Sequence, residues 1–119
     1  FKGKDFYFSN GYWVLNENKN YYFYSSPNQL NQYKDFELSN FINVFSEEIN
    51  EQQLNRLSYF LATNNVKFQI IKELDCSSET QTLIITSGTE NFYKESNCLF
   101  FEGNIDKSID KIGLNLVLK

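Results

Sequence analysis

The apolar residues of this 119-residue chain stand in short runs separated by polar turn segments. The longest runs, such as Leu83-Ile84-Ile85 and Leu116-Val117-Leu118, have the length of a β-strand. A helix that crosses a membrane needs ~18 apolar residues or more, so we expect no membrane span. With 41% apolar and 18% aromatic residues, the chain can still bury a core. It therefore predicts one globular domain over residues 1–119, because disordered chains have low hydrophobicity.

Aromatic residues in short runs predict a three-stranded β-meander at the N-terminus. Asp5–Ser9 has phenylalanines at the alternate positions Phe6 and Phe8, and the turn dipeptide Asn10-Gly11 follows it. Tyr12–Leu15 and Tyr21–Tyr24 are two further aromatic runs, joined by a polar loop. Aromatic side chains suit a pleated surface, where cross-strand pairs stabilise the sheet.

The middle of the chain changes to a helical period. Phe41–Phe45 fits either a helix or a buried strand, and we interpret it as helical. The signal is clear from Asn50, which forms a capping pair with Gln53. Asn64-Asn65 ends this main helix, since asparagine tolerates the left-handed conformation. The apolar stripe of the helix consists of Leu54, Leu57, Phe60 and Leu61.

The C-terminal half predicts mainly strands. These are Val66–Leu74, Gln81–Thr86, Asn97–Glu102 and Leu114–Leu118. Asn104 is expected to cap a short helix that stops at Gly113. The fold class is therefore α+β: a curved, mostly antiparallel sheet of about six or seven strands, packed on one main helix, with a short second helix near the C-terminus.

The chain contains no histidine, which removes several kinds of chemistry. Ser-His-Asp and Cys-His catalysis and imidazole metal sites all need that side chain. The five glycines stand singly, so no phosphate-binding loop is present. We therefore expect no cofactor, no metal and no catalytic residue.

Carboxylates could still support a small enzyme, which we keep as an alternative. Asp106 and Asp110 would share one face of a helix, but Lys107 and Lys111 alternate with them and suggest a solvated surface. No carboxylate stands in an apolar stretch that would raise its pKa. A second cluster, Glu47, Glu48 and Glu51, precedes or begins the main helix, where negative charge favours the helix N-terminus.

The charge balance argues against nucleic acid as a partner. Eleven Lys and Arg face fifteen Asp and Glu, and Arg56 is the only arginine. Phosphate recognition needs a basic surface and favours arginine, so nucleic acid and anionic membranes are poor partners. An acidic surface would instead favour encounter with a basic protein.

Two cysteines bear on the compartment. Cys76 and Cys98 lie in polar surroundings and outside any C-x-x-C pair, which favours a disulfide over a metal site. The chain begins at Phe1 and has no methionine, which either a cleaved secretory signal or a trimmed chain explains. We slightly favour a periplasmic, secreted or lipid-anchored protein, with the cytoplasm as the alternative.

The aromatic hairpin is the main candidate binding surface. Neighbouring residues of a strand point to opposite faces, so Tyr21, Tyr22, Phe23 and Tyr24 cannot all point inward. Either an aromatic patch faces solvent, or the segment Phe36–Phe45 covers it. The expected anchors are Tyr12, Trp13, Tyr21, Tyr22 and Tyr24, with Glu47, Glu48 and Glu51 as acidic surroundings.

The same hairpin resembles one unit of the choline-binding, cell-wall-binding repeats. Their hairpins run Gly-Trp-Val, a turn, then Trp or Tyr, Tyr, and Tyr or Phe, and here Gly11-Tyr12-Trp13-Val14 precedes Tyr21-Tyr22-Phe23. In that family, aromatic rings of successive hairpins hold quaternary ammonium groups or stack on glycans. The resemblance covers about thirteen residues, occurs once and includes an inserted Tyr12, so we do not assign the chain to the family.

Together these features predict a non-enzymatic protein-binding module: an adaptor, an inhibitor or an immunity-type protein. Tyrosine and tryptophan are common anchors of such interfaces. Trp13→Ala should then weaken binding and leave stability nearly unchanged. A glycan- or wall-binding module that uses the same aromatics is the second hypothesis, and the carboxylate enzyme is the third. The identity of the partner and the oligomeric state do not follow from the sequence.

Overall fold

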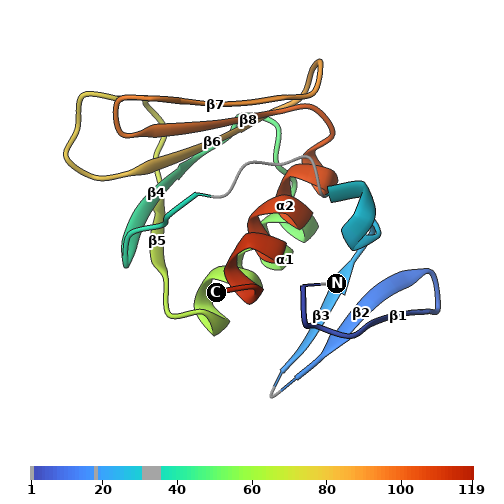
Figure 1. Cartoon of the computed structure of the whole chain (residues 1–119). Helices are drawn as coiled ribbons and strands as arrows, with labels where there is room; N and C mark the ends of the chain where they lie inside the picture. The colour runs from blue at the N-terminus through green and yellow to red at the C-terminus, as the bar shows by residue number, and fades with distance from the viewer. Residues whose placement is uncertain (1, 18, 31–35) are drawn as a thin grey trace.

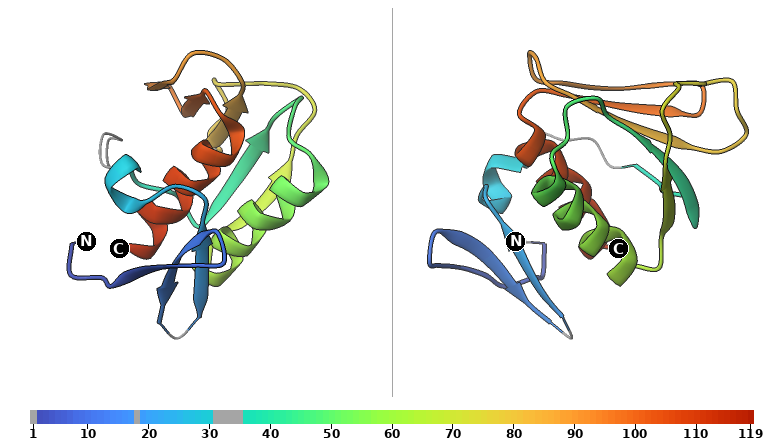
Figure 2. Two further views of the ribbon diagram at one scale, coloured as in Figure 1. Left: turned by 90° about the vertical axis from the view of Figure 1, so that its right-hand side faces the viewer. Right: turned by 180° about the vertical axis from the view of Figure 1, so that it is seen from behind.

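Two β-sheets lie on opposite sides of a pair of packed helices, as Figure 1 and Figure 2 both show. This computed structural model describes residues 2–17, 19–30 and 36–119. The expected α+β class is confirmed, but the expected single sheet on one main helix is wrong. The smaller sheet contains β1 (Phe6–Ser9), β2 (Tyr12–Asn16) and β3 (Asn20–Phe23). The larger sheet contains β4 (Phe41–Phe45), β5 (Lys67–Ile70), β6 (Thr82–Thr86), β7 (Asn91–Glu95) and β8 (Cys98–Glu102).

The smaller sheet is the expected meander. β1 pairs with β2 and β2 with β3, both antiparallel. Asn10 and Gly11 both have positive φ, as the central residues of a two-residue hairpin turn require. A short 3₁₀ helix, η1 (Pro27–Leu30), follows β3.

The larger sheet is mixed, which corrects the expectation of a mostly antiparallel sheet. Its order is β5-β4-β6-β8-β7, and only β7–β8 is antiparallel. Phe41–Phe45, which we interpreted as helical, is strand β4. Residues 42–44 and 82–85 are buried consecutively, as in parallel strands covered on both faces, so these runs do not show the alternation of a half-exposed strand.

Two strand predictions fail at the edges of this sheet. β5 ends at Ile70, whereas Val66–Leu74 was expected as one strand. β7 was not expected, because Asn91–Glu95 is largely polar. Both strands are edge strands with mostly exposed residues, so burial leaves little pattern in their sequence.

The main helix, α1 (Glu51–Thr63), forms as its sequence predicts. The Asn50 side chain accepts a hydrogen bond from the Gln53 backbone at 2.7 Å, and the Gln53 side chain accepts one from the Asn50 backbone at 3.0 Å. This reciprocal capping box satisfies two amides that a helix start otherwise leaves unpaired. Asn65, just beyond the helix, has a positive φ of 63°.

The second helix, α2 (Ile105–Val117), is as long as α1 and is not the short helix that we expected. It continues to Val117 and so takes up all but the last residue of Leu114–Leu118, the expected final strand. Residues 108–117 are all buried, because this part of α2 lies between the two sheets (Figure 2), whereas residues 105–107 of the first turn are half-buried. Gly113 does not stop the helix: a Cβ there would lie 2.6 Å from the Phe60 ring, so glycine permits the close approach of α1.

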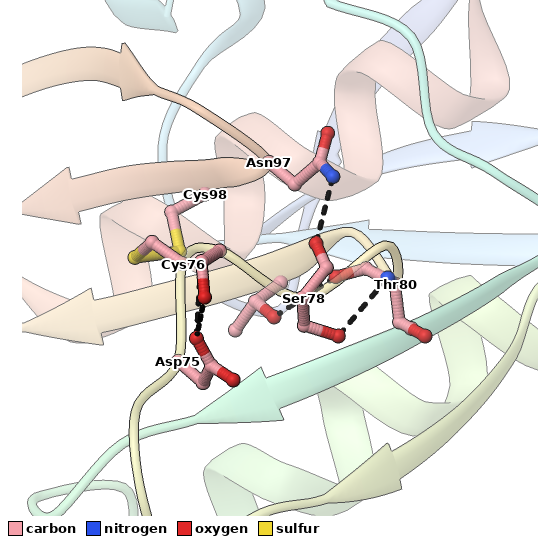
Figure 3. Close-up of a disulfide and its surroundings, with 8 residues drawn as sticks. Asp75, Cys76, Ser78, Thr80, Asn97 and Cys98 are labelled. Carbon is pink, nitrogen blue, oxygen red and sulfur yellow. Dashed lines mark hydrogen bonds between the residues drawn. A yellow bond between two sulfur atoms is a disulfide. The ribbon is translucent and has the colours of Figure 1, made fainter.

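One hydrophobic cluster draws on both sheets and both helices, from Leu15 to Val117. The loop between β5 and β6 is tied to the start of β8 by the Cys76–Cys98 disulfide, with Cα atoms 5.3 Å apart (Figure 3). Asn97 Nδ2 also donates to the Ser78 carbonyl at 2.7 Å. Across the described ranges, neither helix has the length and apolarity to cross a bilayer.

Candidate functional site

The register of the meander separates its aromatic side chains into two sets. Tyr7, Val14 and Tyr22 are partners in one row across the three strands, and Phe8, Trp13 and Phe23 form the adjacent row. Because adjacent rows of a sheet point to opposite faces, these two sets lie on opposite sides. In the second set Phe23 is fully buried and Trp13 packs against the core, whereas Phe8 on the outer strand β1 is 61% exposed.

The first face borders a groove of about 1020 Å³ between the meander and α1. Five of the seven tyrosines in the described ranges line it: Tyr7, Tyr12, Tyr22, Tyr24 and Tyr59. Between them lie the amide residues Asn10, Asn20, Gln52 and Asn55, together with Ser9, Val14 and Arg56. We call this surface the tyrosine groove.

Helix α1 contributes one stripe to the tyrosine groove, since residues 52, 55, 56 and 59 share a helical face. Two side chains of that stripe also hold strand β3. The Tyr59 hydroxyl donates to the Asn20 carbonyl at 2.9 Å, and Arg56 Nη1 donates to the Tyr22 carbonyl at 3.2 Å. These backbone acceptors of β3 are therefore already occupied.

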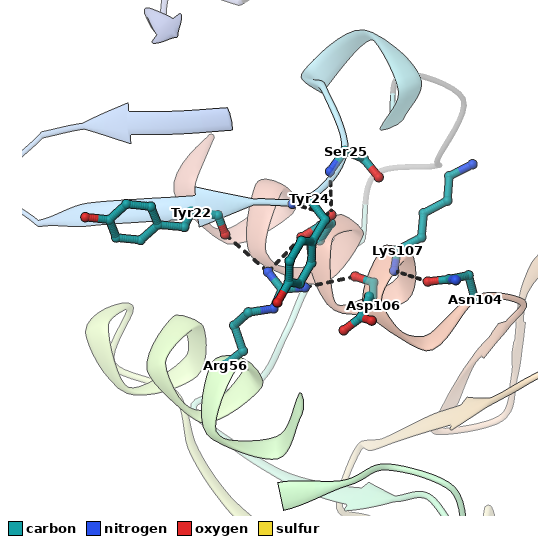
Figure 4. A network of polar contacts seen from close by, with 8 residues as sticks. Tyr22, Tyr24, Ser25, Arg56, Asn104, Asp106 and Lys107 are labelled. Atoms are coloured by element: carbon teal, nitrogen blue, oxygen red, sulfur yellow. Dashed lines mark hydrogen bonds and ion pairs between the residues drawn. The ribbon is translucent and has the colours of Figure 1, made fainter. Parts of the chain in front are cut away.

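Arg56 is the centre of the polar network beneath the groove (Figure 4). Its Nη1 lies 2.8 Å from Asp110 Oδ1, and its Nη2 donates to the Asp106 carbonyl at 3.0 Å. Asp110 Oδ2 accepts from the backbone amides of Tyr24 and Ser25 at 3.1 and 3.0 Å. The pair thus joins the end of the meander to both helices.

The Asp110 carboxyl is completely buried, which corrects our expectation that the 106–111 segment forms a solvated surface. Burial raises the pKa of Asp110, although Arg56 and two backbone amides oppose the shift. The expectation that no carboxylate has a raised pKa is therefore also wrong. The sequence next to Asp110 does not reveal this burial, because the residues that cover the carboxyl come from distant segments of the chain.

The rings of the groove contact one another. Tyr12 lies with its centroid 6.2 Å from that of Tyr22 and 5.3 Å from that of Tyr24. The Arg56 guanidinium carbon is 4.5 Å from the Tyr24 centroid, a cation–π contact. Burial raises the pKa of Tyr24 and that of Tyr59 above their ordinary value, so both phenols stay neutral at physiological pH.

A second hollow, of about 670 Å³, adjoins the groove at Tyr24. Ser25, Asn28, Gln29, Asn104, Asp106 and Lys107 complete its lining. Lys107 donates to Glu90 at 3.2 Å, whereas the half-buried Asp106 carboxylate has no ion-pair partner among the described residues. This end of the groove therefore offers a carboxylate that has no ion-pair partner among the described residues.

Three of the five expected aromatic anchors, Tyr12, Tyr22 and Tyr24, meet in the groove. Trp13 and Tyr21 point to the core instead, and Tyr21 stacks on Phe60 at 5.7 Å. Trp13→Ala is therefore expected to lower stability, contrary to the expectation from sequence. The alternative in which the segment 36–45 covers the aromatic face is wrong, since that face is exposed and Phe41–Phe45 belongs to the other sheet.

The three acidic residues do not line the groove. Glu51 begins α1, but Glu48 accepts hydrogen bonds from the backbone and hydroxyl of Ser87 beyond β6. Those bonds lower the pKa of the Glu48 carboxyl. Glu47 is exposed. The acidic surroundings of the groove are therefore Asp106 and its hollow, which sequence reasoning missed together with Tyr7, Tyr59 and Arg56.

Within the described ranges, no three acidic or cysteine side chains gather in a way that could hold a metal ion. No protein-family model, curated protein or solved structure was found to match the chain. What the groove can bind therefore has to be inferred from its own chemistry.

Proposed function

We propose that this domain is a non-enzymatic protein-binding module whose recognition surface is the tyrosine groove. The observation that carries the proposal is the gathering of five tyrosines on one open surface, while Trp13, Tyr21 and Phe23 on the other face of the meander pack against the core. Folding alone gives no reason to expose such a cluster. Exposed tyrosines are typical anchors of protein interfaces, because they bury a large area at low entropic cost.

The arrangement of the buried acid supports a binding role over catalysis. Asp110 has its carboxylate oxygens engaged by Arg56 and two backbone amides, and it lies beneath the surface. A general acid or base must instead reach a substrate proton. Asp110 therefore serves to hold the groove together.

A glycan-binding module is the second candidate, and one observation favours it. Four amide side chains alternate with the rings of the groove, so hydrogen-bonding groups stand beside apolar ring faces. Sugars offer hydroxyl groups and apolar ring faces to such a surface. Both candidates use the same residues and differ in the ligand.

The compartment that we propose is oxidising: periplasmic, secreted or lipid-anchored. The Cys76–Cys98 disulfide supports it, since such bonds persist mainly outside the cytosol. Alkylation of protein harvested from its own cells tests this proposal. Both cysteines should resist the reagent until a reductant is added, and free thiols would contradict the assignment.

Random-peptide display tests the binding function, with a glycan array run in parallel. Wild-type protein should enrich a set of peptides, and the Tyr12→Ala/Tyr22→Ala double variant should lose them. Tyr93→Ala is the matched control, because Tyr93 lies on the larger sheet and is as exposed as Tyr12, at 37%. Glycan signals that depend on the groove would favour the second candidate, and enrichment that ignores the groove would overturn both.

A further inference from the structure

The groove also indicates which kind of peptide it accepts. We infer that its occupant is an extended, proline-rich segment in the polyproline II conformation, with a basic residue at the Tyr24 end. This inference rests on the proposed function and deepens it. It follows from four features of the described residues: the edge of β3, the charge of the lining, the spacing of two tyrosines and the position of Asp106.

The edge of β3 excludes one common mode of peptide binding. A peptide that adds a strand to a sheet needs free backbone groups along the edge. Here the carbonyls of Asn20 and Tyr22 already accept hydrogen bonds from Tyr59 and Arg56. The occupant must therefore lie on side chains of the groove rather than pair with the backbone of β3.

The lining of the groove has no free charge. Arg56 is its one charged residue, and Asp110 neutralises the guanidinium at 2.8 Å. The rest consists of tyrosines, amides, Ser9 and Val14. A carboxylate placed on this surface would lose hydration without gaining a free cation, so the part of the ligand that lies over the rings carries no negative charge.

Hydroxyl and amide donors suit a polyproline II segment in particular. That conformation makes no internal hydrogen bonds, so its carbonyls stay free to accept them. A helical ligand has most of its carbonyls satisfied internally and would instead need an apolar groove. The hydroxyls of Tyr7 and Tyr22 and the amides of Gln52 and Asn55 offer donors beside the rings.

The spacing across the meander matches one turn of such a segment. Tyr7 and Tyr22 belong to the same row, with Val14 between them. Neighbouring strands lie ~4.8 Å apart, so the two tyrosines start ~10 Å from each other. A polyproline II helix repeats every three residues, or ~9 Å. Val14 is only 3% exposed, so the ligand would contact the tyrosine rings on either side of it rather than Val14 itself.

Asp106 gives the groove a direction. Its carboxylate lies in the hollow that adjoins Tyr24 and forms no ion pair with a described residue. The whole chain has net charge −4, so the wider field also favours a cation. An arginine or lysine next to the proline-rich stretch can reach Asp106 when the prolines occupy the rings.

Calorimetric titration with synthetic peptides tests the inference. The probes are two octapeptides with blocked ends, built from Ala-Pro-Pro repeats and carrying one arginine at either the first or the last position. In the matched controls, glycine and serine replace the prolines or glutamate replaces the arginine. One arginine peptide should bind at least about tenfold more tightly than its Gly/Ser control and several-fold more tightly than its glutamate control.

Variants of the protein locate the binding. Tyr22→Ala should weaken the preferred peptide about tenfold, whereas Tyr93→Ala should leave its affinity within about twofold of wild type. Asp106→Asn should remove the preference for arginine over glutamate while the proline preference remains. Circular dichroism of each variant verifies that it folds.

Three results would overturn the inference: equal binding of the proline and Gly/Ser peptides, an affinity that Tyr22→Ala does not change, or binding of glycans alone. Groove-dependent peptides from the display experiment that contain no proline would also overturn it. In that last case the proposed protein-binding function would stand, so the two failures are distinguishable.

Discussion

Arg56 Nη1 lies 2.8 Å from Asp110 Oδ1, so the only arginine of the chain forms an ion pair with a completely buried aspartate. The two residues come from α1 and α2, and both also bind backbone groups at the end of the meander. The pair therefore fixes the tyrosine-bearing strands on the helices. It accounts for how an open aromatic surface can keep a defined shape.

Removal of one partner should be costly. Asp110→Ala leaves the guanidinium without its counter-charge and leaves two backbone amides unpaired, so we expect a loss of about 3–5 kcal/mol in the free energy of unfolding. Urea denaturation measures it. The double variant Arg56→Met/Asp110→Leu should lose less than Asp110→Ala alone, since it buries no unpaired charge. A loss below about 1 kcal/mol for Asp110→Ala would contradict this role.

Tyr21 and Tyr22 are neighbours in β3 with opposite roles. Tyr21 is 6% exposed and packs on Phe60, whereas Tyr22 is 48% exposed in the groove. Tyr21→Ala should therefore cost about 3 kcal/mol or more of stability. Tyr22→Ala should cost under about 1 kcal/mol. Thermal denaturation of both variants checks the register. Equal losses of stability would show that Tyr21 and Tyr22 do not lie on opposite faces of β3 as assigned.

Gly113→Ala sets two effects against each other. Alanine favours a helix interior over glycine by about 1 kcal/mol, so an exposed site would gain stability. At position 113, however, the added Cβ would meet the Phe60 ring at 2.6 Å. We expect a net destabilisation of about 1–3 kcal/mol, because α1 and α2 must separate or Phe60 must leave its position. Denaturant unfolding decides the sign, and a gain in stability would refute the close packing.

Glu90 should make stability depend on acid pH. Hydrogen bonds from Lys111 and Lys107 lower the pKa of its carboxyl in the folded state below the ordinary 4.5. A lowered folded pKa stabilises the protein above the unfolded value, and the contribution disappears as pH falls through the folded value. Because the Glu90 side chain is 53% exposed, the effect should stay under about 1 kcal/mol.

The melting temperatures of wild type and Glu90→Gln test that sign. Wild type should be the more stable protein above about pH 5, and the two curves should converge near pH 2. A difference that persists in strong acid would assign the effect to packing rather than to ionisation.

Features that depend on residues close together in the chain could be predicted from the sequence. The meander, its Asn10-Gly11 turn and the Asn50–Gln53 capping box depend on residues a few positions apart, and all are present. The pattern also implies that some hairpin aromatics must be exposed. It does not show which set faces out, because that choice depends on where the helices lie.

Features that depend on contacts between distant segments could not be predicted from the sequence. Burial of α2 between two sheets makes Leu114–Leu118 resemble a strand, since a helix covered on all sides has no polar face. Burial of β4 on both faces removes the alternation that would distinguish it from a helix. Arg56 and Asp110 are separated by 54 residues, so neither reveals the other before the chain folds.

Chemical-shift mapping with the tightest ligand from the display experiment tests the central claim most directly. The largest amide shifts should fall on β1–β3 and on the α1 stripe from Gln52 to Tyr59, the residues that line the tyrosine groove. They should be absent from the Tyr12→Ala/Tyr22→Ala variant. Shifts concentrated instead on β5, β7 and the outer face of the larger sheet would contradict the claim that the groove is the recognition surface.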